Sequence, residues 1–229
     1  YNTDLIKKDT AAALCNNFLT LVSNLVSNYE LPVTSVPLIS EEEKQKVLRF
    51  TETKTPYPKD KTIIELFEEQ VLKNPDKTAI VFLDEALTYD QLNRRSNQLA
   101  RTLREKCEVR KDTPVGILVN RSIDLIVGII GILKSGGAYL PIDPEYPQHR
   151  INAIIKDSGC RVLLTQEKFM NQEVEDVILI NLNSPDSYSL DESDVYNINT
   201  SSDLAYIMYT SGTTGGPKGS MIKQQSVVR

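Results

Sequence analysis

The sequence predicts an α/β protein in which helices pack against a largely parallel sheet, and two observations support this fold class. Segments typical of strands alternate with segments typical of helices through residues 62–229, as in strand–helix–strand units. Residues 115–119 form a continuous apolar run, which suits a strand covered on both faces of a parallel sheet. We therefore expect one layered α/β unit to fill most of the chain.

An amphipathic helix is predicted near the N-terminus. Its apolar residues recur at helical spacing and define one face: Leu14, Phe18, Leu21, Val22 and Leu25. We expect this face to pack against its own domain, although a helix that binds a partner protein would show the same stripe.

Residues 31–60 are rich in proline, threonine and charged residues, which is typical of a linker. One short helix is predicted within this segment, because Ser40 and Glu43 have the spacing of a capping box. The first residue is Tyr1 rather than methionine, which suggests a piece of a longer protein.

Three further helix starts are marked by residues that cap a helix N-terminus. Thr62 with Glu65 and Thr88 with Gln91 have the capping-box spacing, and each pair precedes apolar residues at helical intervals. Ser122 is expected to cap the helix that follows the strand at residues 115–119. The sequence therefore places helix starts at three points of the α/β unit.

The other expected elements follow from local patterns. Gly136-Gly137 is predicted to end the third of these helices with a positive φ, and a Pro-rigid connection is expected after it, up to residue 147. The Ser-, Asn- and Asp-rich residues 181–203 are predicted to be a mobile loop without chemistry. The sequence predicts a helix at 148–156 and strands at 79–83, 86–88, 115–119, 161–165, 177–180, 204–209 and 220–222.

Composition narrows the possible functions. A net charge of -5 and a pI near 5.1 argue against a nucleic-acid surface. The longest apolar stretch, residues 125–133, is far shorter than the roughly 20 residues of a membrane span. Cys15, Cys107 and Cys160 form no C-x-x-C pair, so we expect no disulfide framework, no zinc site and a reducing cytoplasm.

The densest chemical signal is the segment YTSGTTGGPKG, residues 209–219, which follows the strand-like run LAYIMY. Its glycines let backbone N–H groups approach a ligand closely, and such a nest of donors suits phosphate oxygens. Threonine and serine hydroxyls add further donors, and Lys218 adds a compact positive charge. The sequence thus predicts a binder of nucleotide polyphosphate; the alternative is a Gly-Thr-rich surface turn without function.

This segment is not a Walker A loop. Counting from Gly212, the sequence has Pro217 where the second glycine of that motif belongs, and Gly219 follows the lysine in place of serine or threonine. A Walker loop opens a helix directly, whereas Pro217 and the apolar residues after it are better suited to a strand.

Three motifs together carry a family resemblance. LAYIMYTSGTTGGPKGSM, residues 204–221, resembles the phosphate-loop motif of the adenylate-forming enzymes, which include peptide synthetase adenylation domains, acyl-CoA ligases and luciferases. LTYDQL (residues 87–92) and LKSGGAYLPIDPEYP (133–147) are similar to the first two core motifs of nonribosomal peptide synthetase adenylation domains, although local capping and turn roles also explain them. The opening YNTDL resembles the last part of a condensation domain.

The resemblance implies a reaction. Members of the family activate a carboxylic acid, here an amino acid, with Mg²⁺ and ATP to form an aminoacyl-adenylate and pyrophosphate, and pass the acyl group to the phosphopantetheine thiol of a carrier domain. It implies ATP phosphate-binding roles for Thr210, Ser211, Gly212, Thr213, Thr214, Gly215 and Lys218. The family's catalytic and metal-binding residues lie downstream, so we expect no catalytic residue and no metal ligand in this stretch.

The resemblance also implies an organisation: residues 1–30 as the C-terminal tail of a condensation domain, 31–60 as an interdomain linker, and 61–229 as the N-terminal part of an adenylation core. The expected partners are the amino-acid substrate, the rest of the adenylation domain, the peptidyl carrier domain and the upstream condensation domain. Two alternatives remain open: a free-standing acyl-CoA ligase, and a non-catalytic half that docks with a separate remainder. Gln224 departs from the family, where histidine often stands.

Overall fold

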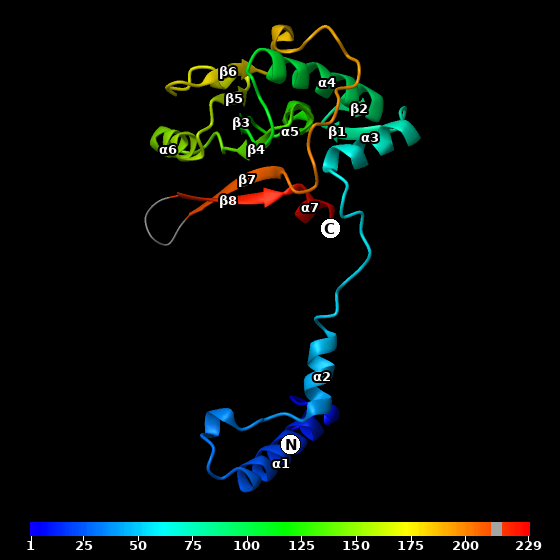
Figure 1. Ribbon diagram of the computed structural model, residues 1–229, viewed down its shortest axis with the longest axis vertical. Coiled ribbons are helices and arrows are strands. Elements are labelled where there is room, and N and C mark those ends of the chain that lie inside the picture. Colours follow the sequence, from blue (N-terminus) through cyan, green and yellow to red (C-terminus); the bar gives the residue numbers. More distant parts are fainter. Residues whose placement is uncertain (212–216) are drawn as a thin grey trace. The chain divides into compact units, whose positions relative to one another are not determined.

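The computed structural model of the protein describes residues 1–211 and 217–229, and the chain divides into two compact units, Tyr1–Pro56 and Tyr57–Arg229. The first unit contains helix α1 (Lys8–Ser27), a short 3-10 turn η1 (Val33–Ser35) and helix α2 (Glu41–Arg49) (Figure 1). The Ser40 hydroxyl accepts a hydrogen bond from the Glu43 N–H, so the predicted start of the short helix is confirmed.

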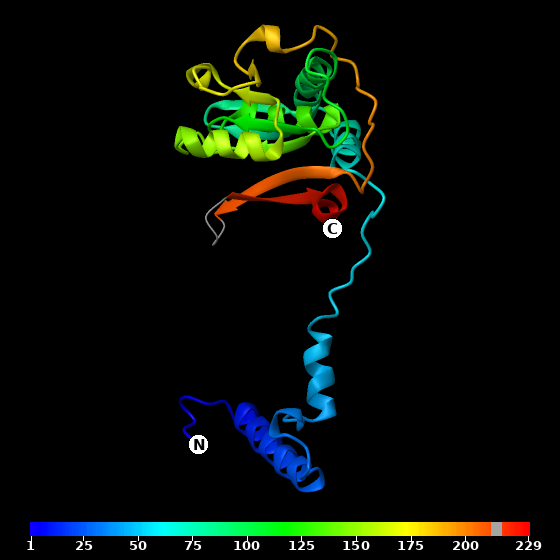
Figure 2. The same cartoon turned by 60° about the vertical axis from the view of Figure 1, so that its left-hand side comes forward.

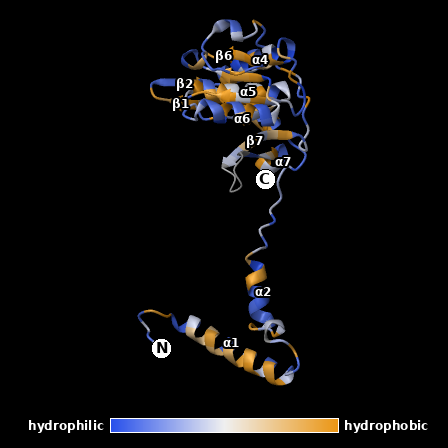
Figure 3. Cartoon of the chain, turned by 90° about the vertical axis from the view of Figure 1, so that its left-hand side faces the viewer, coloured by the Kyte–Doolittle hydropathy of each residue, from blue (hydrophilic) through white to orange (hydrophobic). Residues whose placement is uncertain are grey.

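The predicted N-terminal helix is confirmed as α1, and much of its apolar face is exposed. Leu14, Phe18 and Val22 are 58%, 65% and 42% exposed, and Ala11 is the buried residue of the helix. Apolar residues recur along its length in Figure 3. The described residues of the first unit form helices and no strand, and packing of this face against its own domain stays a prediction.

The second unit is built on a six-stranded sheet with the order β6-β5-β3-β4-β7-β8. Five neighbouring strands run parallel, and β8 pairs antiparallel with β7 at the edge. This arrangement confirms the predicted α/β fold with a largely parallel sheet. The strands are β3 (Pro114–Leu118), β4 (Ala138–Pro141), β5 (Val162–Thr165), β6 (Ile178–Asn181), β7 (Leu204–Ser211) and β8 (Pro217–Lys223).

Strand β4 corrects the interpretation of residues 138–147 as a simple Pro-rigid connection. It lies between β3 and β7, and its Ala138 and Leu140 are completely buried. Gly136, with φ +104°, ends helix α5 (Ile123–Ser135) as predicted, and the strand begins two residues later. A strand of only four residues ending in proline gives too short a pattern to separate from a connection.

Alternate residues of the central strands feed two separate cores. Val115, Ile117 and Leu164 join the core under helices α4 (Tyr89–Glu105) and α5, whereas Leu118 and Leu163 join the core under helix α6 (Gln148–Ser158). Helices therefore cover both faces of the sheet, as parallel sheets require (Figures 1 and 2).

The remaining predicted elements of the second unit are present. Capping boxes open α3 (Ile63–Lys73) and α4, and the Ser122 hydroxyl caps α5 by accepting from the Leu125 N–H. Strands β1 (Thr78–Phe82) and β2 (Glu85–Thr88) form a separate hairpin whose turn includes Leu83, a non-glycine residue with φ +53°. The chain ends in helix α7 (Gln224–Val228), and no helix of the described residues is long and apolar enough to cross a membrane.

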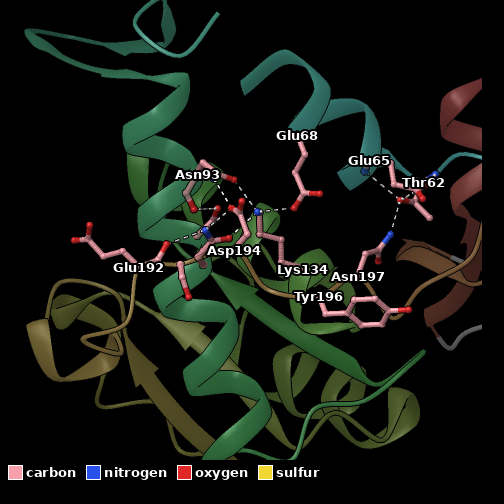
Figure 4. Close-up of polar contacts among 12 residues, drawn as sticks. Thr62, Glu65, Glu68, Asn93, Lys134, Glu192, Asp194, Tyr196 and Asn197 are labelled. Atoms are coloured by element: carbon pink, nitrogen blue, oxygen red, sulfur yellow. Dashed lines mark hydrogen bonds and ion pairs between the residues drawn. The ribbon is translucent and has the colours of Figure 1, made fainter. Parts of the chain in front are cut away.

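Residues 181–203 are mostly irregular, with one 3-10 turn η3 (Pro185–Ser187), but the segment is fastened to α4 by hydrogen bonds rather than being loose. Asp194 accepts from the side-chain amides of Asn93 and Asn97, at 2.9 and 3.1 Å. Further bonds join Gln98 and Arg101 to backbone carbonyls of the segment. Asp194, one of the short polar residues that indicated mobility, thus helps to hold the segment in place (Figure 4).

Lys134, at the end of α5, binds the same two asparagines that hold Asp194. Its side chain is fully buried, and its ammonium donates to Glu68 at 2.9 Å and to the amide oxygens of Asn93 and Asn97 at 2.7 Å each (Figure 4). Burial lowers the pKa of this lysine, while the hydrogen bond and charge of Glu68 act in the opposite direction. All three N–H groups have acceptors, so the buried charge is tolerated.

Candidate functional site

The two ends of the predicted phosphate loop lie side by side. In the β7–β8 ladder Thr210 pairs with Lys218, and both side chains are exposed. Because β7 is parallel to β4, this end of β7 lies at the carboxyl edge of the parallel strands. Open α/β sheets bind ligands at that edge, so a hydroxyl and an ammonium group stand where a ligand is expected.

The other predicted phosphate-binding residues are described less fully. Gly212, Thr213, Thr214 and Gly215 lie outside the described residues, and for Ser211 the structure describes only the backbone, which pairs with Pro217. Of the seven residues in the prediction, the side chains of Thr210 and Lys218 are therefore the ones the structure brings together.

Strand β8 starts at Pro217, three residues before the predicted run at 220–222, and this extends the ladder to the loop. Pro217 at the first position of the strand agrees with the preference of proline for strand starts and edges. The early start matters for the site because it sets Lys218 directly opposite Thr210.

A tyrosine next to the loop ties these strands to the body of the unit. Tyr209 pairs with Gly219 across the ladder, and the Tyr209 hydroxyl donates to the Asp157 carboxylate of α6 at 2.5 Å. Burial, followed by the hydrogen bond and charge of Asp157, raises the pKa of the Tyr209 phenol.

The same edge of the sheet holds an open cleft of about 780 Å³, within the size range of small-molecule sites. Its lining comes from residues at or just after the carboxyl ends of β3, β4 and β7, and includes Asn120, Arg121, Asp143, Glu145 and Tyr209. The sequence did not predict this cleft, because residues 141–147 gave only a turn pattern and the pairing of β4 with β7 was not predicted.

Gln224 has a structural position. It is completely buried, its side-chain oxygen accepts from the Ile63 N–H at 3.1 Å, and its side-chain amide donates to the Leu204 carbonyl at 3.4 Å. Ile63 is the first residue of α3, whose N–H has no partner within its own helix. Gln224 therefore joins α3 to the start of β7, and its amide supplies both a donor and an acceptor.

A comparison with protein families matches residues 67–229 to the AMP-binding enzymes. Among curated proteins, gramicidin S synthase 2 of Brevibacillus brevis is 48% identical over 229 residues, and bacitracin synthase 1 of Bacillus licheniformis is 44% identical over 230 residues. Each alignment covers 100% of this chain but only 5% and 4%, respectively, of the relative.

Solved structures agree with the sequence comparison. The nonribosomal peptide synthetase FmoA3 matches with a TM-score of 0.78 and 26% identity, over 96% of this chain and 24% of that one. Its AMPPNP-bound form matches with a TM-score of 0.79 and 25% identity, over 97% and 24% of the two chains. The N-terminal subdomain of Klebsiella oxytoca NpsA matches in fold, with a TM-score of 0.67 over 74% of this chain and 44% of that one. The family match covers more than two thirds of the residues, and the protein belongs to the AMP-binding enzymes.

Proposed function

We propose that this chain is part of a nonribosomal peptide synthetase and forms the N-terminal part of its adenylation domain. The whole protein would activate an amino acid with ATP to an aminoacyl-adenylate and pyrophosphate, and then load it on the phosphopantetheine thiol of a carrier domain. The observation that carries the proposal is the pairing of Thr210 with Lys218 at the carboxyl edge of the sheet, in a chain that aligns from end to end with peptide synthetases.

The exposed Thr210 hydroxyl and Lys218 ammonium fit phosphate oxygens in both charge and hydrogen-bonding type. In the proposed reaction, the carboxylate of the amino acid attacks the α-phosphate of ATP and pyrophosphate leaves. Lys218 would stabilise the charge that builds on the departing pyrophosphate, and Thr210 would orient it. Ser211, Gly212, Thr213, Thr214 and Gly215 complete the proposed phosphate-binding set.

The described residues contain no cluster of several metal-binding side chains. Within residues 1–211 and 217–229, no group of three acidic, histidine or cysteine side chains lies close enough together to hold a metal. Mg²⁺ often keeps several waters and is held by one or two carboxylates together with the phosphates of its substrate, and we assign none of its ligands to the described residues.

We further propose that residues 1–30 are the tail of a condensation domain and that 31–60 are the linker to the adenylation core. The peptide synthetases align with residues 1–229, whereas the AMP-binding match begins at residue 67, so the similarity continues N-terminal to the adenylation core. The exposed apolar face of α1 agrees with a helix that packs on a larger domain. A free-standing acyl-CoA ligase is disfavoured by the same N-terminal similarity.

The proposed partners follow from this organisation. Besides the amino acid, they are the upstream condensation domain, the peptidyl carrier domain and the rest of the adenylation domain, all in the cytoplasm. Exposed methionines on β7 and β8, Met208 and Met221 at 42% and 68%, support a covering segment from the rest of the adenylation domain. One of the similar FmoA3 structures is a form with bound α-methyl-L-serine-AMP, which is an adenylate of the kind proposed here.

Amino-acid-dependent ATP–pyrophosphate exchange by the full-length protein tests the proposal. We expect exchange with one or a few amino acids, and a loss of about 100-fold in Lys218→Ala, in line with removal of one transition-state donor. Lys223→Ala is the matched control, because Lys223 is an exposed lysine at the other end of the same strand. Equal activity of Lys218→Ala and Lys223→Ala would contradict the proposal, as would exchange with no amino acid.

A further inference from the structure

The contact between Tyr209 and Gly219 gives the last glycine of the loop motif a steric role. A β-carbon built at Gly219 would lie 2.9 Å from Cζ and 3.0 Å from Cε2 of the Tyr209 ring, so the ring would have to shift. Gly219 lies inside β8, so the absence of a side chain, and not an unusual backbone angle, is what this position needs. The tyrosine ring takes the space over the glycine, a known way to cover a glycine on an edge strand.

The far end of the same ring is also held. The Tyr209 hydroxyl donates to Asp157, which lies in the last turn of α6. Helix α6 is fixed in turn by Ile151 and Ile154, both almost fully buried in the core that it shares with β3, β4, β5 and β7. One side chain therefore spans from β7 over β8 to a helix anchored in the core.

This span lies one residue from the proposed phosphate-binding pair. Thr210 follows Tyr209 on β7, and Lys218 precedes Gly219 on β8, so Tyr209–Gly219 is the ladder pair next to Thr210–Lys218. Strand β8 has no strand neighbour on its other side among the described residues. Its placement at Lys218 thus depends on the β7 ladder and on contacts such as the Tyr209 ring.

We propose that Tyr209 is a positioning residue that fixes the ends of β7 and β8 so that Thr210 and Lys218 meet the phosphates of ATP. Its hydroxyl is held by Asp157, and its ring packs over Gly219. Tyr209 acts through Thr210 and Lys218 and does not take part in the chemistry. The inference rests on the proposed function, which supplies ATP as the ligand. Whether Tyr209 fixes β7 and β8 can be measured without ATP.

The kinetic test uses the full-length protein and four variants. Tyr209→Phe keeps the ring and removes the hydroxyl, Asp157→Ala removes the acceptor, and Asp157→Asn keeps an acceptor oxygen. We expect Tyr209→Phe and Asp157→Ala each to raise KM for ATP in pyrophosphate exchange by about five- to tenfold, the effect of losing one hydrogen bond to a charged group at a partly exposed site. Asp157→Asn should restore most of the affinity, and the double variant Tyr209→Phe/Asp157→Ala should be no worse than either single change.

KM for the amino acid is the readout that separates positioning from general damage. A variant that only folds less well lowers the amount of active enzyme and leaves both KM values unchanged. We expect KM for ATP to rise and KM for the amino acid to stay within about twofold of the original. Tyr206→Phe is the matched control: this tyrosine lies three residues earlier on β7, packs its ring 5.2 Å from that of Tyr139, and should leave KM for ATP unchanged.

Hydrogen exchange measured by mass spectrometry tests the same inference without activity. In Tyr209→Phe the amides of β7 and β8 next to the loop should exchange about five- to tenfold faster, whereas Tyr206→Phe should leave them unchanged. Unchanged protection in Tyr209→Phe, or an equal rise of KM for ATP in Tyr206→Phe, would overturn the inference. If the original protein showed no ATP–pyrophosphate exchange with any amino acid, the proposed function would be wrong. The hydrogen-exchange protection of β7 and β8 would still show whether Tyr209 fixes these strands.

Discussion

Replacement of Lys134 by methionine tests how the second unit is held together. Methionine has nearly the volume of the lysine stem but no donor, so the amide oxygens of Asn93 and Asn97 and one carboxylate oxygen of Glu68 lose their partner. The two asparagines are buried, while the Glu68 side chain is 29% exposed and can bind water instead. The expected damage therefore comes mainly from two unsatisfied amide oxygens.

The magnitude follows from that count. Each buried acceptor left without a donor costs about 1–3 kcal/mol, and removing the buried ammonium returns part of its own desolvation cost. We expect Lys134→Met to lower the free energy of unfolding by about 3 kcal/mol, which is a large share of the stability of a typical domain. Hydrogen exchange should also rise in residues 189–197, because Asn93 and Asn97 hold Asp194 with the same amide groups.

Urea unfolding followed by circular dichroism measures the change, with exposed Lys223→Met as the control. A change in the free energy of unfolding below about 0.5 kcal/mol in Lys134→Met, the range of an ordinary surface substitution, would show that the Lys134 hydrogen bonds do not stabilise the second unit.

Three further predictions follow from single contacts. Gly219→Ala should impair ATP–pyrophosphate exchange by displacing the Tyr209 ring, and in a Tyr209→Ala background, where the ring is absent, the same change should have little further effect; an unimpaired Gly219→Ala would contradict the steric role. Hydrogen bonds, first from Asn93, lower the pKa of Asp194, so its contribution to stability is complete above the unfolded value of about 4 and is lost as pH falls through the lower folded value. The free energy of unfolding should therefore fall less steeply with decreasing pH in Asp194→Asn than in the original protein. Identical pH profiles of the two proteins would exclude a contribution of the Asp194 carboxylate to stability. Gly136→Ala should lower the melting temperature, because φ is +104° there and the new β-carbon would lie 2.6 Å from Ile198; an unchanged melting temperature would show that the turn adapts.

Much of the fold follows from local sequence. The capping boxes at Thr62 and Thr88, the Ser122 cap and the Gly136 end are formed by neighbours in the chain, so their spacing predicts them. Most strands were found as short apolar runs between turn residues. The sequence does not predict strand β4, because four residues are too few for a recognisable strand pattern. Its strand conformation depends on pairing with β3 and β7 on either side.

The parts that the sequence did not predict depend on long-range contacts. Asp194 meets Asn93 and Asn97 across about a hundred residues of chain, and a polar segment without such partners would look the same in sequence. The pairing of Thr210 with Lys218 can be predicted from the sequence, because few residues separate two predicted strands there. The hydrogen bond from Tyr209 to Asp157 cannot be predicted in this way, since no local pattern connects a strand residue to a helix residue 52 positions earlier.

Formation of aminoacyl-adenylate by the full-length protein, compared between the original sequence and Lys218→Ala, tests whether the β7–β8 edge binds the phosphates of ATP. We expect one or a few amino acids to give the adenylate together with pyrophosphate, and Lys218→Ala to reduce the rate of adenylate formation by about 100-fold. Equal rates of adenylate formation in the original protein and Lys218→Ala would contradict the assignment of phosphate binding to the β7–β8 edge. If no amino acid gave the adenylate with the original protein, the proposed activity would be contradicted.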